Sequence, residues 1–292
     1  HGLFRQALPD GFQRELPEDW LANGSPWEFK RPEVAYEIGF GGTVDAPHDA
    51  HHLGARTWKP AETVRAVAYD NPIVGWRGRY VATLRLWSAR SVDPISLEEF
   101  NRGDHVGALA ERAKAEAISK VLYPSDSTPA GQELRLRQEF FFTSASLQDL
   151  LRRHVQQGLA IGDLADHAAI QLNDTHPAIA VPELMRLLVD VHDVPWAKAW
   201  DITRATLSYT NHTLLPEALE AWDESLFGRL LPRHIQLIDR IDATHAARNP
   251  SRQQSMRADH QVKMGQLSFV MAHKVNGVSA LHTDLMKSTV FS

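Results

Sequence analysis

The segment from Gln171 to Pro177 carries the side chains with the clearest chemical potential in this chain. It reads Gln-Leu-Asn-Asp-Thr-His-Pro and follows an apolar run from Ala168 to Leu172. A strand that ends in Asn, Asp, Thr and His before a helix directs hydrogen-bonding side chains toward the carboxyl edge of a sheet, where α/β enzymes bind ligands. We therefore expect Asp174 and His176 to face a polar ligand, with a sugar as the leading candidate. The alternative is that both side chains only cap the helix that follows.

Two further polar groupings suggest weaker hypotheses. The segment Tyr209 to Thr213 reads Tyr-Thr-Asn-His-Thr and ends another predicted strand, so Asn211 and His212 should pack and hydrogen-bond near a ligand cleft. Three histidines lie in a loop of Ala, Pro and Asp without a carboxylate framework or a recognised ligand spacing, which predicts no metal site there. They are His48, His51 and His52.

Composition limits the classes of protein that remain. The 292 residues, 43% hydrophobic and 23% charged, suffice for one large core or two modest ones. A net charge of -5 gives no support for a nucleic acid or an anionic membrane as partner. The absence of cysteine excludes disulfides, thiolate metal sites and a cysteine nucleophile, and it favours a cytoplasmic location. No apolar run approaches the roughly 20 residues of a membrane helix. The chain opens at His1 without methionine, and we interpret it as an excerpt of a longer protein.

The first half of the chain has the patterns of strands followed by a helix. Asp70-Asn71-Pro72 is typical of a turn, and Gly75 and Gly78 bracket another. Apolar residues then recur at intervals of three and four residues from Leu97 to Leu122. This spacing predicts one long helix that ends before Pro124. Apolar residues alternate with other residues, as in half-buried strands of a twisted sheet, in residues 31–42, 63–69 and 80–87.

The second half predicts helices around further strands. Residues 134–142 favour a strand or the entry to a helix, and 146–154 an amphipathic helix. After Pro177 a helix should have Pro182 in its first turn, with Glu183 complementing its dipole. Its buried stripe should be Leu184, Leu187, Leu188 and Val191. Helices are also predicted from Pro195 to about Ser208 and from Trp222 to Arg240, before a polar, weakly patterned segment at 243–260 and an apolar one at 263–275. The alternation from Ala168 onward predicts an α/β sheet covered by helices.

Several longer phrases resemble the α-1,4-glucan phosphorylases, and the bacterial type of glycogen phosphorylase in particular. They follow the family's order along essentially the whole chain, and several ordered matches are far more specific than one short pattern. The phrases are residues 19–21, 26–28, 31–33, 84–89, 133–139, 169–177, 209–220, 231–234 and 275–278.

The resemblance implies an enzyme that cleaves the terminal α-1,4 linkage of glycogen, starch or maltodextrin with inorganic phosphate and releases glucose 1-phosphate. It implies two Rossmann-like domains of the GT-B type, with pyridoxal phosphate on a lysine of the carboxyl-terminal domain. This chain resembles only part of the amino-terminal domain and has no match to the cofactor-lysine motif. We expect a strand-rich part (1–95), a long helix with a gate loop (97–131) and an α/β part (132–292). The isolated chain should therefore be catalytically incomplete.

The resemblance also implies roles for residues of the sugar site. Asp174 and His176 would line the glucosyl subsite, where a carboxylate and an imidazole suit sugar hydroxyls and an oxocarbenium-like transition state. His273 matches a histidine that contacts the primary hydroxyl of the sugar, although Met271-Ala272 before it departs from the usual Gly-Ser.

Other matched residues are expected to control access and regulation. Asp126 lies in the gate loop over the cleft, whose neighbouring family asparagine and aromatic are replaced here by serine and threonine. Arg135 occupies a family position near this loop, or it is a solvated surface arginine. Arg152 and Arg153 match a pair that binds an activating nucleotide phosphate in allosteric members, and paired guanidinium groups can bind phosphate. The alternative is that these two are solvated and complement the helix dipole.

The expected partners are α-1,4-glucan, phosphate and, in the full-length parent, a second subunit. Residues 100–116 resemble the long intersubunit helix of the family. The alternative function is a non-catalytic carbohydrate-binding or dimer-forming remnant. A nucleotide-sugar glycosyltransferase of similar architecture is a more distant possibility. Residues 243–260 are shorter than the family's connection, which could impair even a completed enzyme.

Overall fold

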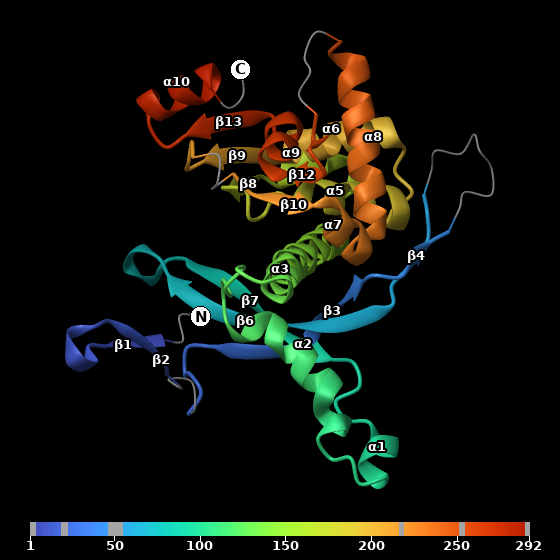
Figure 1. Ribbon diagram of the computed structural model, residues 1–292. Coiled ribbons are helices and arrows are strands. Elements are labelled where there is room, and N and C mark those ends of the chain that lie inside the picture. The colour runs from blue at the N-terminus through green and yellow to red at the C-terminus, as the bar shows by residue number, and fades with distance from the viewer. Residues whose placement is uncertain (1–3, 19–22, 46–54, 216–218, 251–254, 290–292) are drawn as a thin grey trace. The chain divides into compact units, whose positions relative to one another are not determined.

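The chain folds into two compact units in the computed structural model, which describes residues 4–18, 23–45, 55–215, 219–250 and 255–289 (Figure 1). The first unit combines His1–Ile38 with Thr63–Gln138, and the second combines Gly39–Glu62 with Glu139–Ser292. The three histidines at 48, 51 and 52 lie outside the described residues. Among the described residues, no helix has both the length and the hydropathy to cross a membrane.

The first unit is built on a three-stranded sheet in the order β3 (Phe29–Phe40), β6 (Glu62–Val74) and β7 (Val81–Ser91) (Figure 1). These strands confirm the three that the alternating pattern predicts, and β6 and β7 pair antiparallel. The short strands β1 (Phe4–Ala7) and β2 (Arg14–Pro17) form a separate antiparallel pair.

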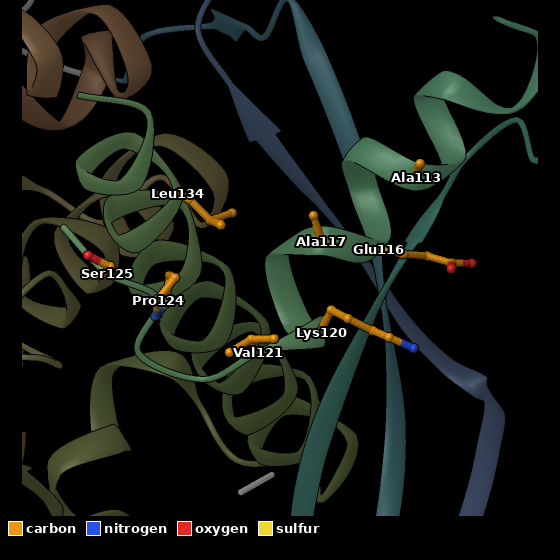
Figure 2. A pocket seen from close by; sticks show the side chains of 8 residues that line it. All are labelled: Ala113, Glu116, Ala117, Lys120, Val121, Pro124, Ser125 and Leu134. Atoms are coloured by element: carbon orange, nitrogen blue, oxygen red, sulfur yellow. The ribbon is translucent and has the colours of Figure 1, made fainter. Parts of the chain in front are cut away.

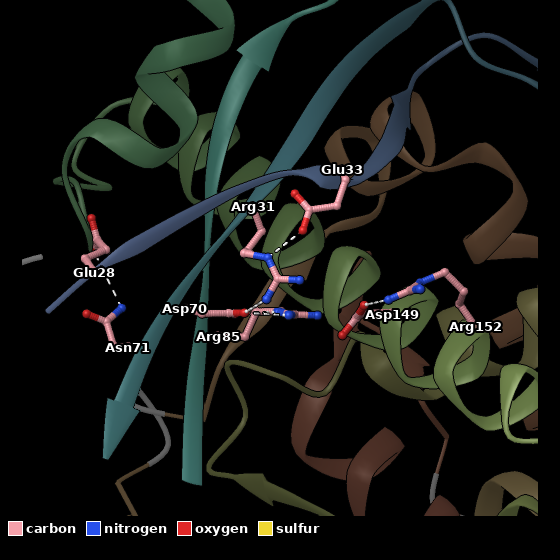
Figure 3. A network of polar contacts seen from close by, with 8 residues as sticks. All are labelled: Glu28, Arg31, Glu33, Asp70, Asn71, Arg85, Asp149 and Arg152. Carbon is pink, nitrogen blue, oxygen red and sulfur yellow. Dashed lines mark hydrogen bonds and ion pairs between the residues drawn. The ribbon is translucent and has the colours of Figure 1, made fainter. Parts of the chain in front are cut away.

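The turn predicted at Asp70-Asn71-Pro72 is wrong, because β6 continues through these residues and stays paired with β7. The carboxylate of Asp70 does not turn back onto its own backbone. Nε and Nη2 of Arg85 each donate to it at 2.7 Å, and Nη1 of Arg31 donates at 3.0 Å (Figure 3). The hydrogen bond and charge of Arg85 hold the pKa of Asp70 below its usual value against the effect of burial. The hairpin instead turns at Gly75, whose N–H donates to the carbonyl of Tyr80.

The single long helix predicted from Leu97 to Leu122 is also wrong, because the segment is broken. It forms α1 (Leu97–Asn101), a 3-10 turn at Gly107–Leu109 and α2 (Ala110–Lys120). Gly103 adopts a φ of 92° after α1, and the Asp104 carboxylate accepts from the N–H of Gly107 at 2.8 Å. A left-handed residue followed by an Asp that binds the backbone ends one helix and begins the next.

Helix α3 (Pro129–Gln156) joins the two segments that the sequence pattern kept apart at 134–142 and 146–154. The second unit also contains a parallel sheet in the order β13 (Lys274–Gly277), β9 (Leu207–Asn211) and β8 (Ile170–Asn173). Its remaining elements are β4 (Thr43–Val44), β5 (Trp58–Lys59), α4 (Leu164–His167), α5 (Ala180–Arg186), α6 (Trp196–Thr206), β10 (Ala221–Asp223), α7 (Glu224–Leu230), α8 (Pro232–Arg248), β11 (Arg257–Ala258), β12 (Gln261–Lys263), α9 (Met264–Met271) and α10 (Ala280–Ser288).

The parallel sheet forms part of the core of the second unit. Helices α6 and α9 contact its central strand β9, and Leu172, Leu207 and Tyr209 are at most 1% exposed. The mixed α/β class predicted from the sequence is therefore confirmed for this unit.

Two details of the second unit differ from the sequence pattern. The helix predicted from Trp222 to Arg240 begins as strand β10 and contains a break at Leu231, after which α8 continues to Arg248. Val191, predicted to be buried, is 55% exposed because α5 gives way to a π-helical turn at Leu187–Val191, which rotates the last residue out of the buried stripe.

Candidate functional site

A row of polar residues crosses the carboxyl end of the parallel sheet. Asn173 and Asn276 both lie opposite Thr210 in the strand register. Nε2 of Gln171 donates to Oγ1 of Thr210 at 2.8 Å, and that hydroxyl donates to Oδ1 of Asn276 at 3.1 Å. Because all three strands are parallel, their carboxyl ends meet at one edge, as the sequence predicted for a ligand site.

Asp174 continues from β8 at this edge in a left-handed backbone conformation, with φ 65°. Its N–H donates to the carbonyl of Thr210 at 2.9 Å, and its Oδ1 accepts from the N–H of Thr175 at 2.6 Å. The next helix, α5, begins only at Ala180, and its N-cap residue makes no side-chain cap. The structure therefore does not support the alternative that Asp174 and His176 cap this helix.

Two carboxylates lie near the side chain of His176 on the same loop. Its Nδ1 lies 3.8 Å from Oε1 of Glu220 and 4.0 Å from Oε1 of Glu139. The His176 side chain is 42% exposed, whereas those of Glu139 and Glu220 are 8% and 12% exposed. Imidazole and carboxylate can also ligate metals, and these donor atoms all lie within 4.8 Å of one another. The imidazole-to-carboxylate distances exceed the roughly 3.3 Å between ligands of a tetrahedral zinc ion, so we assign no metal to them.

Sequence reasoning missed Glu139 and Glu220 as neighbours of the site. Glu139 is an isolated acid before the aromatic run Phe140–Phe142 in α3, and an ionisable group in a buried stripe needs a compensating partner. That signal could have identified it. Both glutamates belong to family-like phrases, at 133–139 and 209–220, but nothing in the spacing of Glu220 connects it with His176.

Buried polar groups lie beneath the same edge. Nδ2 of Asn211 donates to the hydroxyl of Tyr209 at 3.0 Å, and Oδ1 of Asn211 accepts from Nε2 of His282 at 2.9 Å. Burial raises the pKa of the Tyr209 hydroxyl to about 12, opposed by the hydrogen bond from Asn211 and supported by the charge of Asp174. His282 lies on α10, and Gly277 at the end of β13 faces it closely: a Cβ on Gly277 would lie 2.5 Å from Cδ2 of His282.

The structure does not bring His273 to this edge. It directly precedes β13, where its N–H donates to the carbonyl of Leu207 at 3.0 Å and its Nδ1 lies 2.7 Å from the same oxygen. Leu207 begins β9, so His273 lies at the amino edge of the sheet, opposite the edge that carries Asp174. Contact of His273 with the same sugar remains a prediction that this arrangement does not support.

The predicted gate-loop residues lie in the first unit. Nη1 of Arg135 lies 3.5 Å from Oδ2 of Asp126, and its guanidinium stacks 5.4 Å from the ring centre of Tyr123. Arg135 is only 17% exposed at its side chain and Asp126 is 61% exposed. The alternative of a solvated surface arginine is therefore not what the structure shows.

A hollow of about 570 Å³ lies next to this loop (Figure 2). Its wall is mostly aliphatic, and the charged ends of Glu116 and Lys120 point away from Leu134 in the close view. This lining lacks the paired hydrogen-bonding groups that a sugar requires. The lining residues are Ala113, Glu116, Ala117, Lys120, Val121, Pro124, Ser125 and Leu134.

The predicted phosphate pair lies near the end of α3, in the second unit. Nη2 of Arg152 donates to Oδ1 of Asp149 at 2.9 Å (Figure 3), and Nη1 donates to Gln156 at 2.7 Å. Arg153 is exposed in the last turn of the helix. Arg152 is thus already engaged by a carboxylate, and binding of an effector phosphate by the pair stays a prediction.

Comparisons with known proteins agree along the whole chain. The family model for carbohydrate phosphorylases matches residues 1–292. Glycogen phosphorylase of Haemophilus influenzae is 46% identical over 305 residues, which cover 100% of this chain and 36% of that protein. The liver form of glycogen phosphorylase of Homo sapiens is 42% identical over 311 residues, with the same two coverages. Glycogen phosphorylase 2 of Dictyostelium discoideum is 43% identical over 302 residues, or 99% of this chain and 30% of that protein. The chain thus spans about a third of the length of these curated relatives.

Proposed function

Because the chain belongs to the carbohydrate phosphorylase family, we propose that it supplies the glucosyl-binding edge of a glycogen phosphorylase. The completed enzyme would cleave terminal α-1,4 linkages of glycogen or maltodextrin with phosphate and release glucose 1-phosphate. The observation that carries this proposal is the loop after β8, which holds Asp174 and His176 at the carboxyl edge of three parallel strands. The whole-chain similarity to relatives named glycogen phosphorylase supports the substrate class.

Asp174 and His176 have complementary roles in this proposal. The N–H of Thr175 donates a hydrogen bond to Oδ1 of Asp174. The second carboxylate oxygen can accept a hydrogen bond from a sugar hydroxyl. His176 is part-exposed and can donate to another hydroxyl. As the glycosidic bond breaks, positive charge develops on the sugar ring, and a fixed carboxylate nearby lowers the energy of that state.

Pyridoxal phosphate is the cofactor that the family resemblance implies. Every lysine within the described residues is exposed or only half-buried. An enclosed Schiff base therefore does not fit the lysines that the structure describes. We propose that the cofactor is held by a lysine of the carboxyl-terminal domain of the full-length parent, because this chain has no match to the cofactor-lysine motif.

The finer architecture and setting are part of the same proposal. The parallel unit of β8, β9 and β13 with its covering helices supports a Rossmann-like domain of a GT-B enzyme. Family membership supports a homodimeric, cytoplasmic parent protein. The contact between Asp126 and Arg135 supports a gate loop held from α3, with contacts that differ from those of a loop carrying asparagine and an aromatic residue.

The proposal is tested by maltoheptaose binding to the 292-residue chain, measured by calorimetry, in the wild type and in D174N. Losing the carboxylate should weaken binding at least about tenfold, because charge-assisted hydrogen bonds to a ligand contribute about 1.5–3 kcal/mol. D193N is the matched control, since Asp193 is exposed and also has a positive φ, of 51°.

A second measurement addresses the chemistry. The chain completed with the carboxyl-terminal part of a related phosphorylase and loaded with pyridoxal phosphate should release glucose 1-phosphate from maltodextrin. No release from a folded, cofactor-loaded protein would leave carbohydrate binding without catalysis as the function. No affinity for maltoheptaose in either protein would refute the proposal altogether.

A further inference from the structure

We propose that Glu139 and Glu220 are positioning residues that hold the imidazole of His176 in its doubly protonated, cationic form. The site would thereby present a fixed positive hydrogen-bond donor to the ligand. The part of this inference that concerns the glucan rests on the proposed function, whereas the part that concerns the charge of His176 does not.

The geometry indicates a charge interaction rather than a pair of hydrogen bonds. Nδ1 of His176 lies 3.8 Å from Glu220 and 4.0 Å from Glu139, beyond the roughly 2.7–3.2 Å of an N–H···O hydrogen bond. Both distances are within the range at which an opposite charge favours the ionised form of its neighbour. The same ring nitrogen faces both carboxylates, and a positive charge on the ring strengthens its attraction to both of them.

Burial strengthens this attraction. The side chains of Glu139 and Glu220 are about nine-tenths buried, and two like charges in such surroundings are costly unless a cation offsets them. The part-exposed ring of His176 can exchange its proton with solvent and can still face a ligand. Asp174 lies two residues before His176 on the same loop, and its Oδ1 accepts from the backbone N–H of Thr175.

The two carboxylates come from separately anchored segments. Glu139 lies in the interior of the 28-residue helix α3. The carbonyl of Glu220 accepts from the N–H of Met264, at the start of α9, at 3.1 Å. The loop of His176 is fixed by Thr175, which is fully buried and whose carbonyl accepts from the N–H of Ala178 at 2.9 Å. Such anchoring keeps the charges in place without a ligand, which is the requirement for an electrostatically prepared site.

The test is a pH titration of the His176 ring by NMR in the 15N-histidine-labelled chain, with metal chelated and with H176Q used to assign the signal. In the wild type the ring should keep its second proton to higher pH than in E139Q or E220Q, and E139Q/E220Q should show the largest shift to lower pH. E133Q is the matched control. Glu133 lies on the same helix and pairs with Arg137 at 2.9 Å, so its removal should leave the titration of His176 unchanged.

Two results would overturn the inference. One is a titration of His176 that is the same in the wild type and in both single variants while all of them remain folded. The other is stoichiometric binding of added Zn²⁺ that replaces the Nδ1 proton, which would make the three side chains a metal site instead.

Binding of maltoheptaose separates this inference from the proposed function. If the ring is cationic, affinity should fall as the pH rises through the His176 transition, and E139Q should show the same fall at lower pH. If the affinity for maltoheptaose does not change through this transition, the charge of His176 has no role in glucan binding. A chain that binds no maltoheptaose, yet shows the expected shifts of the ring, would refute the proposed function and leave the charge assignment intact.

Discussion

Tyr209 shows how strongly the pKa of one side chain depends on its burial in the parallel sheet. It is fully buried in β9, and its hydroxyl accepts a hydrogen bond from Asn211. Its pKa of about 12 lies above the ordinary value of 10.0, so the folded state favours the protonated hydroxyl. Stability from this group is fully present below pH 10 and is lost as the pH rises from 10 toward 12.

We predict that the free energy of unfolding of the wild type falls relative to that of Y209F by up to about 3 kcal/mol over this range. Near pH 8, Y209F should be less stable by about 1 kcal/mol, because the hydrogen bond with Asn211 is lost. Urea unfolding at a series of pH values measures both effects. Y80F is the control, since Tyr80 is exposed. A difference between wild type and Y209F that stays constant up to pH 12 would contradict the prediction.

At the same scale, the sequence identified Asp174 and His176 correctly as residues of a polar strand end. It could not identify the neighbours that give them their electrostatic setting. Glu139 and Glu220 are separated from His176 by 37 and 44 positions in the sequence, and only the packing of α3 and of the segment before β10 brings them together.

Glu183 of helix α5 shows that the role of a residue can depend on contacts that only the folded structure reveals. The sequence places Glu183 near the start of this helix as a partner of its dipole, and the position is correct. The side chain, however, is fully buried. Arg186 donates to both of its oxygens at 2.7 and 2.9 Å, His234 lies 2.7 Å away through Nε2, and Ser144 donates at 2.6 Å. Burial would raise the pKa of Glu183, but the charge and hydrogen bonds of Arg186 with the bond to His234 lower it to about 2.

We predict that E183Q lowers the free energy of unfolding at pH 7 by about 3 kcal/mol or more, because removing one partner leaves Arg186 buried without its counter-charge. The depressed pKa contributes stability that is present above about pH 4.5 and is lost as the pH falls toward 2. E183Q should therefore lose less stability than the wild type between pH 5 and 3. E111Q, on the exposed face of α2, serves as the control in the same denaturation series. Equal stability of E183Q and wild type at pH 7 would show that the network contributes nothing.

Two of the helical segments that the sequence mispredicted share one cause. The helical period continues through Arg102-Gly103-Asp104 and through Leu187–Val191, so the pattern alone predicts unbroken helices there. The breaks come from backbone conformations, a φ of 92° at Gly103 and a π-helical turn after α5. The strands were easier to predict, because alternation over β3, β6 and β7 reflects burial on one face, which does not depend on distant contacts.

At the scale of the whole molecule, family resemblance predicted more than local patterns could. Ordered phrases along the chain identified the family correctly, and the relatives confirm it over all 292 residues. Neither the family resemblance nor the similarity to relatives reveals that the chain divides into two units made from interleaved segments. These are 1–38 with 63–138 and 39–62 with 139–292. That division depends on which strands and helices pack together.

We predict that the 292-residue chain alone, supplied with pyridoxal phosphate, maltodextrin and phosphate, releases no glucose 1-phosphate above a protein-free control. The physical reason is that no lysine within the described residues is buried, so none can hold the cofactor in an enclosed site. A coupled assay of glucose 1-phosphate provides the measurement, with a full-length relative as positive control. Release that depends on both the chain and the cofactor would contradict the prediction.

The close approach of Gly277 to α10 has a consequence for sequence variation. One added methyl group would lie 2.5 Å from Cδ2 of His282 and 3.0 Å from Sδ of Met286. Any side chain at this position must therefore displace the side chain of His282, which would disturb its hydrogen bond with Asn211. Selection should remove substitutions at Gly277 and tolerate them at exposed neighbours such as Val278. The presence of glycine at this position should therefore indicate whether a related sequence keeps the same strand end.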